Sequence, residues 1–144
     1  MIYWFTGQPG AGKTVLADLL KQNNLGRVFR IDGDEMRDLF ANKDYSIKGR
    51  IANIDAAQKI AHYLHNQGQT VIVSLVSPYL DQREEFKKTL GDALVEFYVH
   101  TNEERGREQY HVEGYQPPLN DFIDVDTTHD TPEESLKKII KNVK

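Results

Sequence analysis

A glycine-rich segment near the amino terminus constrains the fold more than any other feature of the chain. It reads Gly7-Gln8-Pro9-Gly10-Ala11-Gly12-Lys13-Thr14, a full match to the pattern G-x-x-x-x-G-K-[ST]. The pattern requires a strand before it and a helix after it. Apolar and amphipathic periodicity predicts both, at residues 2–6 and 13–22. The amino terminus is therefore predicted to form a strand, a phosphate-binding loop and a helix.

Each residue type in this loop has a chemical task. Glycines allow positive φ angles and let backbone N–H groups converge on phosphate oxygens at a helix N-terminus. Lys13 can bring positive charge to the β- and γ-phosphates, and the Thr14 hydroxyl can ligate Mg²⁺. The loop thus predicts binding of ATP with Mg²⁺. The alternative is a glycine-rich turn that only joins the strand to the helix.

Strand-like and helix-like segments alternate along the rest of the chain. Strands are predicted at residues 2–6, 27–31, 70–75, 95–99 and 122–125, and helices at 13–22, 50–66, 79–90 and after Thr131. Two more helices are expected, one after Asp34 and one between the fourth and fifth strands. This order predicts an α/β fold of the P-loop NTPase type, a three-layer αβα arrangement around a parallel five-stranded sheet.

Length and composition fit one domain over residues 1–144. The chain has 39% apolar residues, a net charge of −4 and no cysteine. The absence of a basic surplus argues against a long nucleic acid as partner. Since neither a leader nor a membrane-spanning run is found, we expect a cytoplasmic protein with no membrane partner.

Two carboxylates follow the second predicted strand. Asp32 and Asp34 lie at the sheet edge where ligands bind, and a carboxylate there can hold water on Mg²⁺ or accept the proton of an attacking hydroxyl. A second interpretation, compatible with the first, is a turn in which Asp34 caps a helix beginning at Glu35.

A kinase also needs a pocket for its acceptor. Arg37, Arg50 and Asn53 follow the two carboxylates and carry planar groups suited to a phosphate or a similar anion. For an isolated arginine on a helix, the alternative is a solvated surface charge.

Together these motifs resemble the adenylylsulfate kinase (APS kinase) family of P-loop kinases. That family uses MgATP to phosphorylate the 3′-hydroxyl of adenosine 5′-phosphosulfate (APS). The resemblance covers nearly the whole chain, and its motifs occur in the family's order. They are residues 7–14, 32–37, 45–46 with Arg50 and Asn53, 73–79, 125–127 and 132–135.

The resemblance implies a role for individual residues. Asp34 would act as the base or as a metal-linked carboxylate, with Asp32 and Lys13 in support and Thr14 on Mg²⁺. The ATP-binding set is Gly7, Gln8, Pro9, Gly10, Ala11, Gly12, Lys13, Thr14, Arg105 and Arg107. The acceptor-binding set is Arg37, Tyr45, Arg50, Asn53, Val76 and Ser77.

Ser77 is also a catalytic candidate, because it matches a serine proposed in the family as a phosphoserine intermediate. In-line transfer from MgATP needs no covalent relay, however. A serine before proline is equally typical of a turn or a cap.

The chain departs from the family in its lid, at about residues 102–120. The family's lid is longer and carries a Lys-Ala-Arg segment and a Phe that stacks on the acceptor adenine. Arg105 and Arg107 are the lid residues best suited to ATP, but two residues apart on a helix they would face different ways, so only one is expected to touch it. A short lid predicts slower transfer or more hydrolysis.

We interpret the chain as an ATP-dependent kinase for a small nucleotide-like acceptor, with APS as the leading candidate. The resemblance also implies a homodimer. Three alternatives stay open: a kinase for another hydroxylated metabolite such as a phosphoramidate, a kinase for a nucleic-acid end or base, and a nucleotide-binding module without transfer activity. The retained Lys13, Thr14 and Asp34 oppose the last of these.

Overall fold

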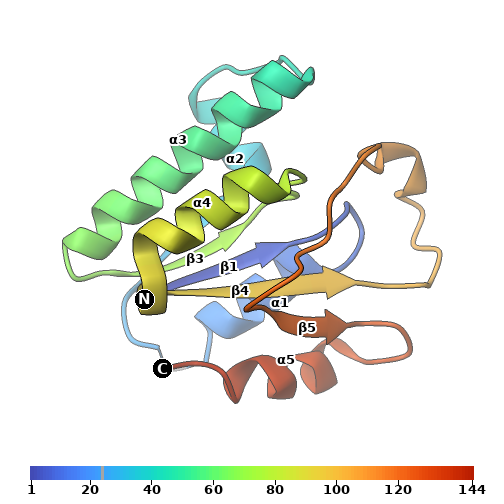
Figure 1. The fold of residues 1–144 in the computed structure, drawn as a ribbon. Helices are drawn as coiled ribbons and strands as arrows, with labels where there is room; N and C mark the ends of the chain where they lie inside the picture. Colours follow the sequence, from blue (N-terminus) through green and yellow to red (C-terminus); the bar gives the residue numbers. More distant parts are fainter. Residues whose placement is uncertain (24) are drawn as a thin grey trace.

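The computed structural model describes residues 1–23 and 25–144, and it confirms the predicted fold class (Figure 1). Five strands form one parallel sheet in the order β2-β3-β1-β4-β5. Their bounds are β1 Ile2–Thr6, β2 Val28–Asp32, β3 Thr70–Ser74, β4 Leu94–His100 and β5 Ile123–Asp126. All five strands therefore end at the same edge of the sheet.

Helices cover both faces of the sheet and complete the three layers (Figure 1). One face carries α2 Gly33–Leu39, α3 Ile47–Asn66 and α4 Leu80–Leu90, and the other carries α1 Lys13–Lys21 and α5 Pro132–Ile140. Among the described residues, no helix combines the length and the hydropathy that crossing a membrane requires.

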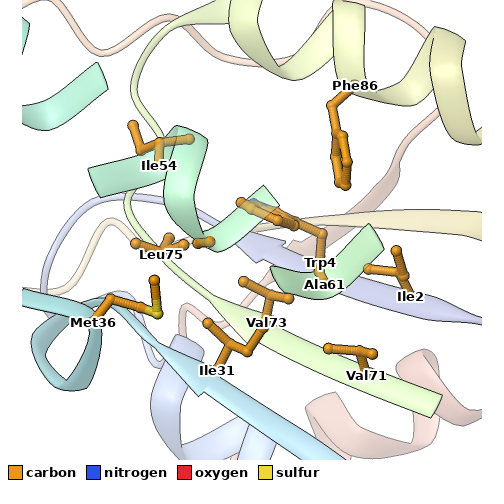
Figure 2. Packing of buried hydrophobic residues seen from close by; sticks show 11 residues of the cluster. Ile2, Trp4, Ile31, Met36, Ile54, Ala61, Val71, Val73, Leu75 and Phe86 are labelled. Carbon is orange, nitrogen blue, oxygen red and sulfur yellow. The ribbon is translucent and has the colours of Figure 1, made fainter. Parts of the chain in front are cut away.

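The central strand β1 shows why the core forms on both sides. A strand covered on both faces alternates its side chains between two apolar layers. Ile2 and Trp4 pack into the layer beneath α3 and α4, whereas Tyr3 and Phe5 pack into the layer facing α1 and α5. Figure 2 shows Trp4 close to Phe86 of α4, with the two rings edge to face at 5.6 Å between centroids.

The structure corrects the expectation of a helix between the fourth and fifth strands. Within the described residues, this connection contains only a three-residue 3₁₀ turn, Glu108–Tyr110. The segment from residue 102 to residue 111 is exposed throughout, so it has no apolar face to bury against the sheet. Without such burial, a short helix is not stable.

The predicted cap of α2 was also wrong. The helix begins at Gly33, and Asp32 is its N-cap: its Oδ2 accepts a hydrogen bond of 3.1 Å from the backbone N–H of Asp34. Asp32 is the last residue of β2 and already has the extended backbone that an N-cap requires. Similarly, α3 begins three residues earlier than predicted, because the Ser46 side chain caps it.

A buried carboxylate joins α4 to the sheet. Glu96 of β4 contacts Nε of Arg83 at 3.2 Å and Nζ of Lys87 at 2.9 Å. The side chains of Arg83 and Glu96 are each 2% exposed. Arg83 also donates a hydrogen bond to the backbone oxygen of Gln116, in the connection between β4 and β5. This cluster therefore holds α4, β4 and the second half of that connection together.

We expect Glu96→Gln to lower the free energy of unfolding by about 3–5 kcal/mol, since it leaves Arg83 a buried cation without its partner. Urea denaturation followed by circular dichroism measures the loss. Glu84→Gln is the matched control, because Glu84 also contacts Lys87, at 3.2 Å, but is 40% exposed. It should cost less than about 1 kcal/mol. Equal losses in the two variants would contradict the role of Glu96.

Candidate active site

The phosphate loop follows β1, whose carboxyl end lies between those of β3 and β4. Ligands of open α/β sheets bind beyond this edge. Figure 1 shows the long connection between β4 and β5 extending past the same edge and returning beside the loop. The site is thus bounded by the loop, by α2 and by this connection, which we call the lid (residues 102–120).

Two glycines of the loop are required by its geometry. A Cβ at Gly7 would lie 2.1 Å from the backbone oxygen of Val99 on β4, so no side chain fits there. Gly12 is the N-cap of α1 and has a left-handed backbone with φ of 109°. The loop can therefore turn tightly beside β4 and present the first N–H groups of α1 to a phosphate.

Lys13 is buried and its amine is held within the loop. Its Nζ donates a hydrogen bond of 2.9 Å to the backbone oxygen of Gln8. Burial lowers the pKa of Lys13 to about 8; the positive charge of Arg107 acts in the same direction, and Asp32 and Asp34 partly oppose it. A bound polyphosphate would stabilise the charged amine.

Asp32 and Asp34 differ in how their carboxylates are used. Asp32 Oδ1 accepts hydrogen bonds from the hydroxyls of Ser74, at 3.1 Å, and Thr14, at 3.5 Å. The Asp34 side chain is exposed and makes no hydrogen bond or ion pair with the described residues. Asp32 is therefore fixed in place, whereas Asp34 can interact with a ligand.

Two cavities meet at Asp34. The first has a volume of about 410 Å³ and is lined by the phosphate loop, including Lys13 and Thr14, and by Asp32. The second, of about 590 Å³, is lined by Arg37, Tyr45, Arg50, Asn53 and Ser77. Both cavities are lined by Asp34, Val76 and Arg107. A carboxylate and a guanidinium therefore stand between a phosphate cradle and a second binding cavity.

Arg37 is held rigidly at the wall of the second cavity. Its guanidinium carbon lies 3.9 Å from the ring centroid of Tyr45, and its Nη1 donates to the backbone oxygens of Asn42 and Asp44 at 3.2 and 2.9 Å. These contacts fix the plane of the guanidinium, whose Nε and Nη2 make no hydrogen bond with the described residues and could bind an anion in the cavity.

Asn53 lies in the same cavity and has an unused acceptor. The residue is 5% exposed, and its Oδ1 has no hydrogen-bond partner among the described residues. A buried acceptor without a partner costs about 1–3 kcal/mol. Because the oxygen is itself buried, a ligand in the cavity would recover that energy once the Asn53 side chain turns toward it.

Ser77 lies at the floor of the second cavity with its hydroxyl tied to the core. It is 1% exposed, and its Oγ accepts a hydrogen bond of 3.1 Å from the indole N–H of Trp4. Its φ of 46° is left-handed, a strained conformation for a serine. Because its backbone oxygen also accepts a hydrogen bond from Arg83, Ser77 links the cavity to the buried ion pair.

Arg105 and Arg107 both line the first cavity. Arg105 donates to the backbone oxygens of Ala11, at 3.3 Å, and Thr127, at 2.9 Å. Arg107 packs against the loop, since a Cβ built at Gly10 would lie 3.1 Å from the Cβ of Arg107. The expectation that only one arginine faces this site rested on a helix that the described lid does not contain.

Sequence reasoning missed two contributors to the site, Ser74 and Thr127, and the contact made by a third residue, Gln8. Ser74 orients Asp32, and a polar residue ending a buried apolar strand was a signal for it. The Thr127 hydroxyl donates to the backbone oxygen of Ala11 at 2.9 Å, which ties the end of β5 to the loop. The side chain of Gln8 contacts the lid rather than a phosphate position, and no local pattern indicates this.

Comparison with known proteins identifies the family. The model of the adenylylsulphate kinase family matches residues 1–137. The chain belongs to this family. Members are ATP-dependent kinases, and the match confirms the resemblance derived from the motifs.

Individual relatives cover most of the chain. The adenylyl-sulfate kinase of Rippkaea orientalis is 34% identical over 94% of this chain and 87% of its own length. The cytidine diphosphoramidate kinase of Campylobacter jejuni is 27% identical over 94% of this chain and 83% of its own length. The structure of the Mycobacterium tuberculosis APS kinase in complex with AMPPNP and APS superposes with a TM-score of 0.81, at 25% identity, covering 97% of this chain and 95% of that one.

The lowered pKa of Lys13 predicts that ATP binding takes up protons. At pH 8 roughly half of the Lys13 amines are neutral, and the triphosphate should recharge them, giving an uptake approaching half a proton per ATP. At pH 6.5 Lys13 is already charged and adds no uptake. Calorimetry in buffers of different ionisation enthalpy measures the number of protons taken up per ATP bound. The wild type is compared with Lys13→Arg, whose guanidinium stays charged. Equal uptake by both proteins at pH 8 would contradict the lowered pKa.

Proposed function

We propose that this chain transfers the γ-phosphoryl group of ATP to the 3′-hydroxyl of APS. The observation that carries the proposal is the position of Asp34, which lines both the phosphate-loop cavity and the second cavity. A protein that only binds a nucleotide has little use for an uncommitted carboxylate at that junction. Family membership and the kinases it resembles support the choice of reaction.

In this proposal the loop amides and Lys13 stabilise negative charge on the γ-phosphoryl group. Asp34 accepts the proton of the acceptor hydroxyl as its oxygen bonds to the γ-phosphorus. The bond from that phosphorus to the bridging oxygen of the leaving ADP breaks, so the ADP carries away the electron pair. Arg107, which lines both cavities, adds positive charge where the two substrates meet.

The donor groups around Thr14 fit Mg²⁺. The Thr14 hydroxyl and the Asp32 carboxylate lie 3.5 Å apart at the mouth of the loop, and both are oxygen ligands. No group of three or more His, Cys, Asp or Glu in residues 1–23 and 25–144 could hold a metal by itself. Mg²⁺ bound mainly by substrate phosphates and water needs no such cage. We propose that Thr14 ligates the ion, that Asp32 or Asp34 holds its water, and that the ion neutralises phosphate charge.

The second cavity has the groups that a nucleotide anion requires. Arg37 and Arg50 would bind the phosphosulfate, because both are guanidinium groups on its wall. Tyr45 offers a ring surface, and the unpartnered Oδ1 of Asn53 would accept a hydrogen bond from the nucleoside. In this assignment Ser77 shapes the cavity floor through its bond to Trp4 and takes no covalent part.

A second candidate acceptor is a cytidine nucleotide with a phosphoramidate group. The similarity to the Campylobacter jejuni cytidine diphosphoramidate kinase, which covers 94% of this chain, favours it. Both acceptors combine a nucleoside hydroxyl with a modified phosphate, so the same arginines would serve either. The base distinguishes them, and the described lid lacks a Phe that could stack on a purine.

Acceptor identity is tested by ADP release with APS, with cytidine diphosphoramidate and with unmodified AMP and CDP at equal concentration. We expect APS to give at least about tenfold higher kcat/KM than the others, because the chain belongs to the adenylylsulphate kinase family. A higher kcat/KM with cytidine diphosphoramidate than with APS would identify the cytidine compound as the acceptor instead. No acceptor-dependent ADP above the ATP-only background would refute both.

Asp34→Asn tests the base. The amide keeps the shape of the side chain but cannot take the proton, so kcat should fall at least about 100-fold while the Kd for ATP stays within about threefold. Asp38→Asn is the matched control, since Asp38 is exposed on the same helix and makes no side-chain hydrogen bond with the described residues. An Asp34→Asn enzyme as active as the control would refute the assignment.

The assembly remains part of the proposal. We propose one kinase domain over residues 1–144 that acts as a homodimer, which sedimentation equilibrium would test against a monomer. A cytoplasmic location stays a prediction.

A further inference from the structure

Gln8 occupies a variable position of the phosphate-loop pattern, so phosphate binding does not dictate its side chain. Its carboxamide is nevertheless committed. Nε2 donates to the backbone oxygen of Val112 at 2.9 Å, and Oε1 accepts from the backbone N–H of Val112 at 2.8 Å. Gln8 and Val112, which are 104 positions apart, are thereby joined by a pair of hydrogen bonds. The Gln8 carboxamide takes the place that a peptide group of a neighbouring strand has in a sheet.

The first half of the lid is fastened at two points. Near its start, Arg105 donates to the backbone oxygens of Ala11 and Thr127, and further along the chain Val112 is held by Gln8. Of residues 102–114, all described, Val112 alone is buried. The second half of the lid has separate anchors: the Tyr115 hydroxyl lies 2.8 Å from that of Thr6, and Arg83 holds the Gln116 backbone. Losing the bonds from Gln8 would therefore release residues 106–114 and leave the anchors on either side of them, at Arg105 and at Tyr115, in place.

The fastened segment carries a charge that matters at the loop. Arg107 packs against Gly10 and lies close enough to Lys13 to lower its pKa. The backbone oxygen of Gln8 meanwhile accepts the hydrogen bond of Lys13. One residue thus holds the phosphate-binding amine through its main chain and the lid through its side chain.

We propose that Gln8 is a positioning residue that holds the short lid closed over the phosphate loop. It thereby sets how much of the γ-phosphoryl group goes to the acceptor hydroxyl rather than to water. The inference rests on the proposed kinase function. Exclusion of water from a phosphoryl-transfer site depends on a closed lid. In this chain, two hydrogen bonds from the Gln8 side chain hold the middle of a lid, residues 106–114, in which only Val112 is buried.

The test compares the full-length protein with Gln8→Met, which keeps the length of the side chain and removes both hydrogen bonds. We expect kcat for APS phosphorylation to fall about tenfold and the ratio of ATP hydrolysed to phosphoryl transferred to rise at least about fivefold. The Kd for ATP should stay within about threefold, since loop amides and Lys13 still hold the phosphates. Trypsin should cleave after Arg107, which lies in the segment that Gln8 holds, at least about tenfold faster.

Glu113→Gln is the control, because Glu113 is exposed beside Val112 and makes no side-chain hydrogen bond with the described residues. It should match the wild type in all four measurements. A Gln8→Met protein with unchanged hydrolysis ratio and trypsin rate would overturn the proposal. So would a loss of ATP affinity in proportion to kcat, since that indicates a damaged loop.

The test also separates this inference from the proposed function. If the wild type phosphorylates no APS, the acceptor assignment fails, while ATP hydrolysis and trypsin cleavage still report on the lid. If the wild type is active and Gln8→Met equals it throughout, only the role of Gln8 fails.

Discussion

The close approach of the phosphate loop to β4 is the constraint on which the site depends. A Cβ at Gly7 would lie 2.1 Å from the Val99 oxygen, so the chain leaving β1 must pass close beside β4 without a side chain. This path directs the loop amides and Lys13 to the sheet edge, where β2 delivers Asp32 and where α2 begins. The phosphate cradle and the carboxylates therefore meet because of backbone geometry.

The carboxylates of Asp32 and Asp34, at this edge of the sheet, differ in the contacts that they make. Asp32 caps α2 and accepts from Ser74 and Thr14, which fixes it beside the loop. The same cap starts α2 early enough to place Asp34 one residue into the helix, facing both cavities. A helix cap thus settles which carboxylate is free for proton transfer.

Local patterns predicted the phosphate loop and the five strands, because strand and helix periods and the glycine pattern depend on neighbours in sequence. The full set of residues assigned to the acceptor came from the resemblance to the APS kinase family, and their role stays a prediction. Local patterns failed for Asp34 as a cap and for a lid helix, because competition between caps and a lack of burial decide those. The bond from Gln8 to Val112 and the unpartnered Asn53 oxygen depend on tertiary contacts, which no short-range pattern contains.

The central claim is that Asp34 joins a donor cavity to an acceptor cavity. A crystal structure with a non-hydrolysable ATP analogue and APS tests it most directly. We expect the γ-phosphate beside Lys13 and the 3′-hydroxyl within hydrogen-bonding distance of the Asp34 carboxylate, with the phosphosulfate on Arg37 or Arg50. An acceptor bound outside the second cavity, or a hydroxyl directed away from Asp34, would contradict the account.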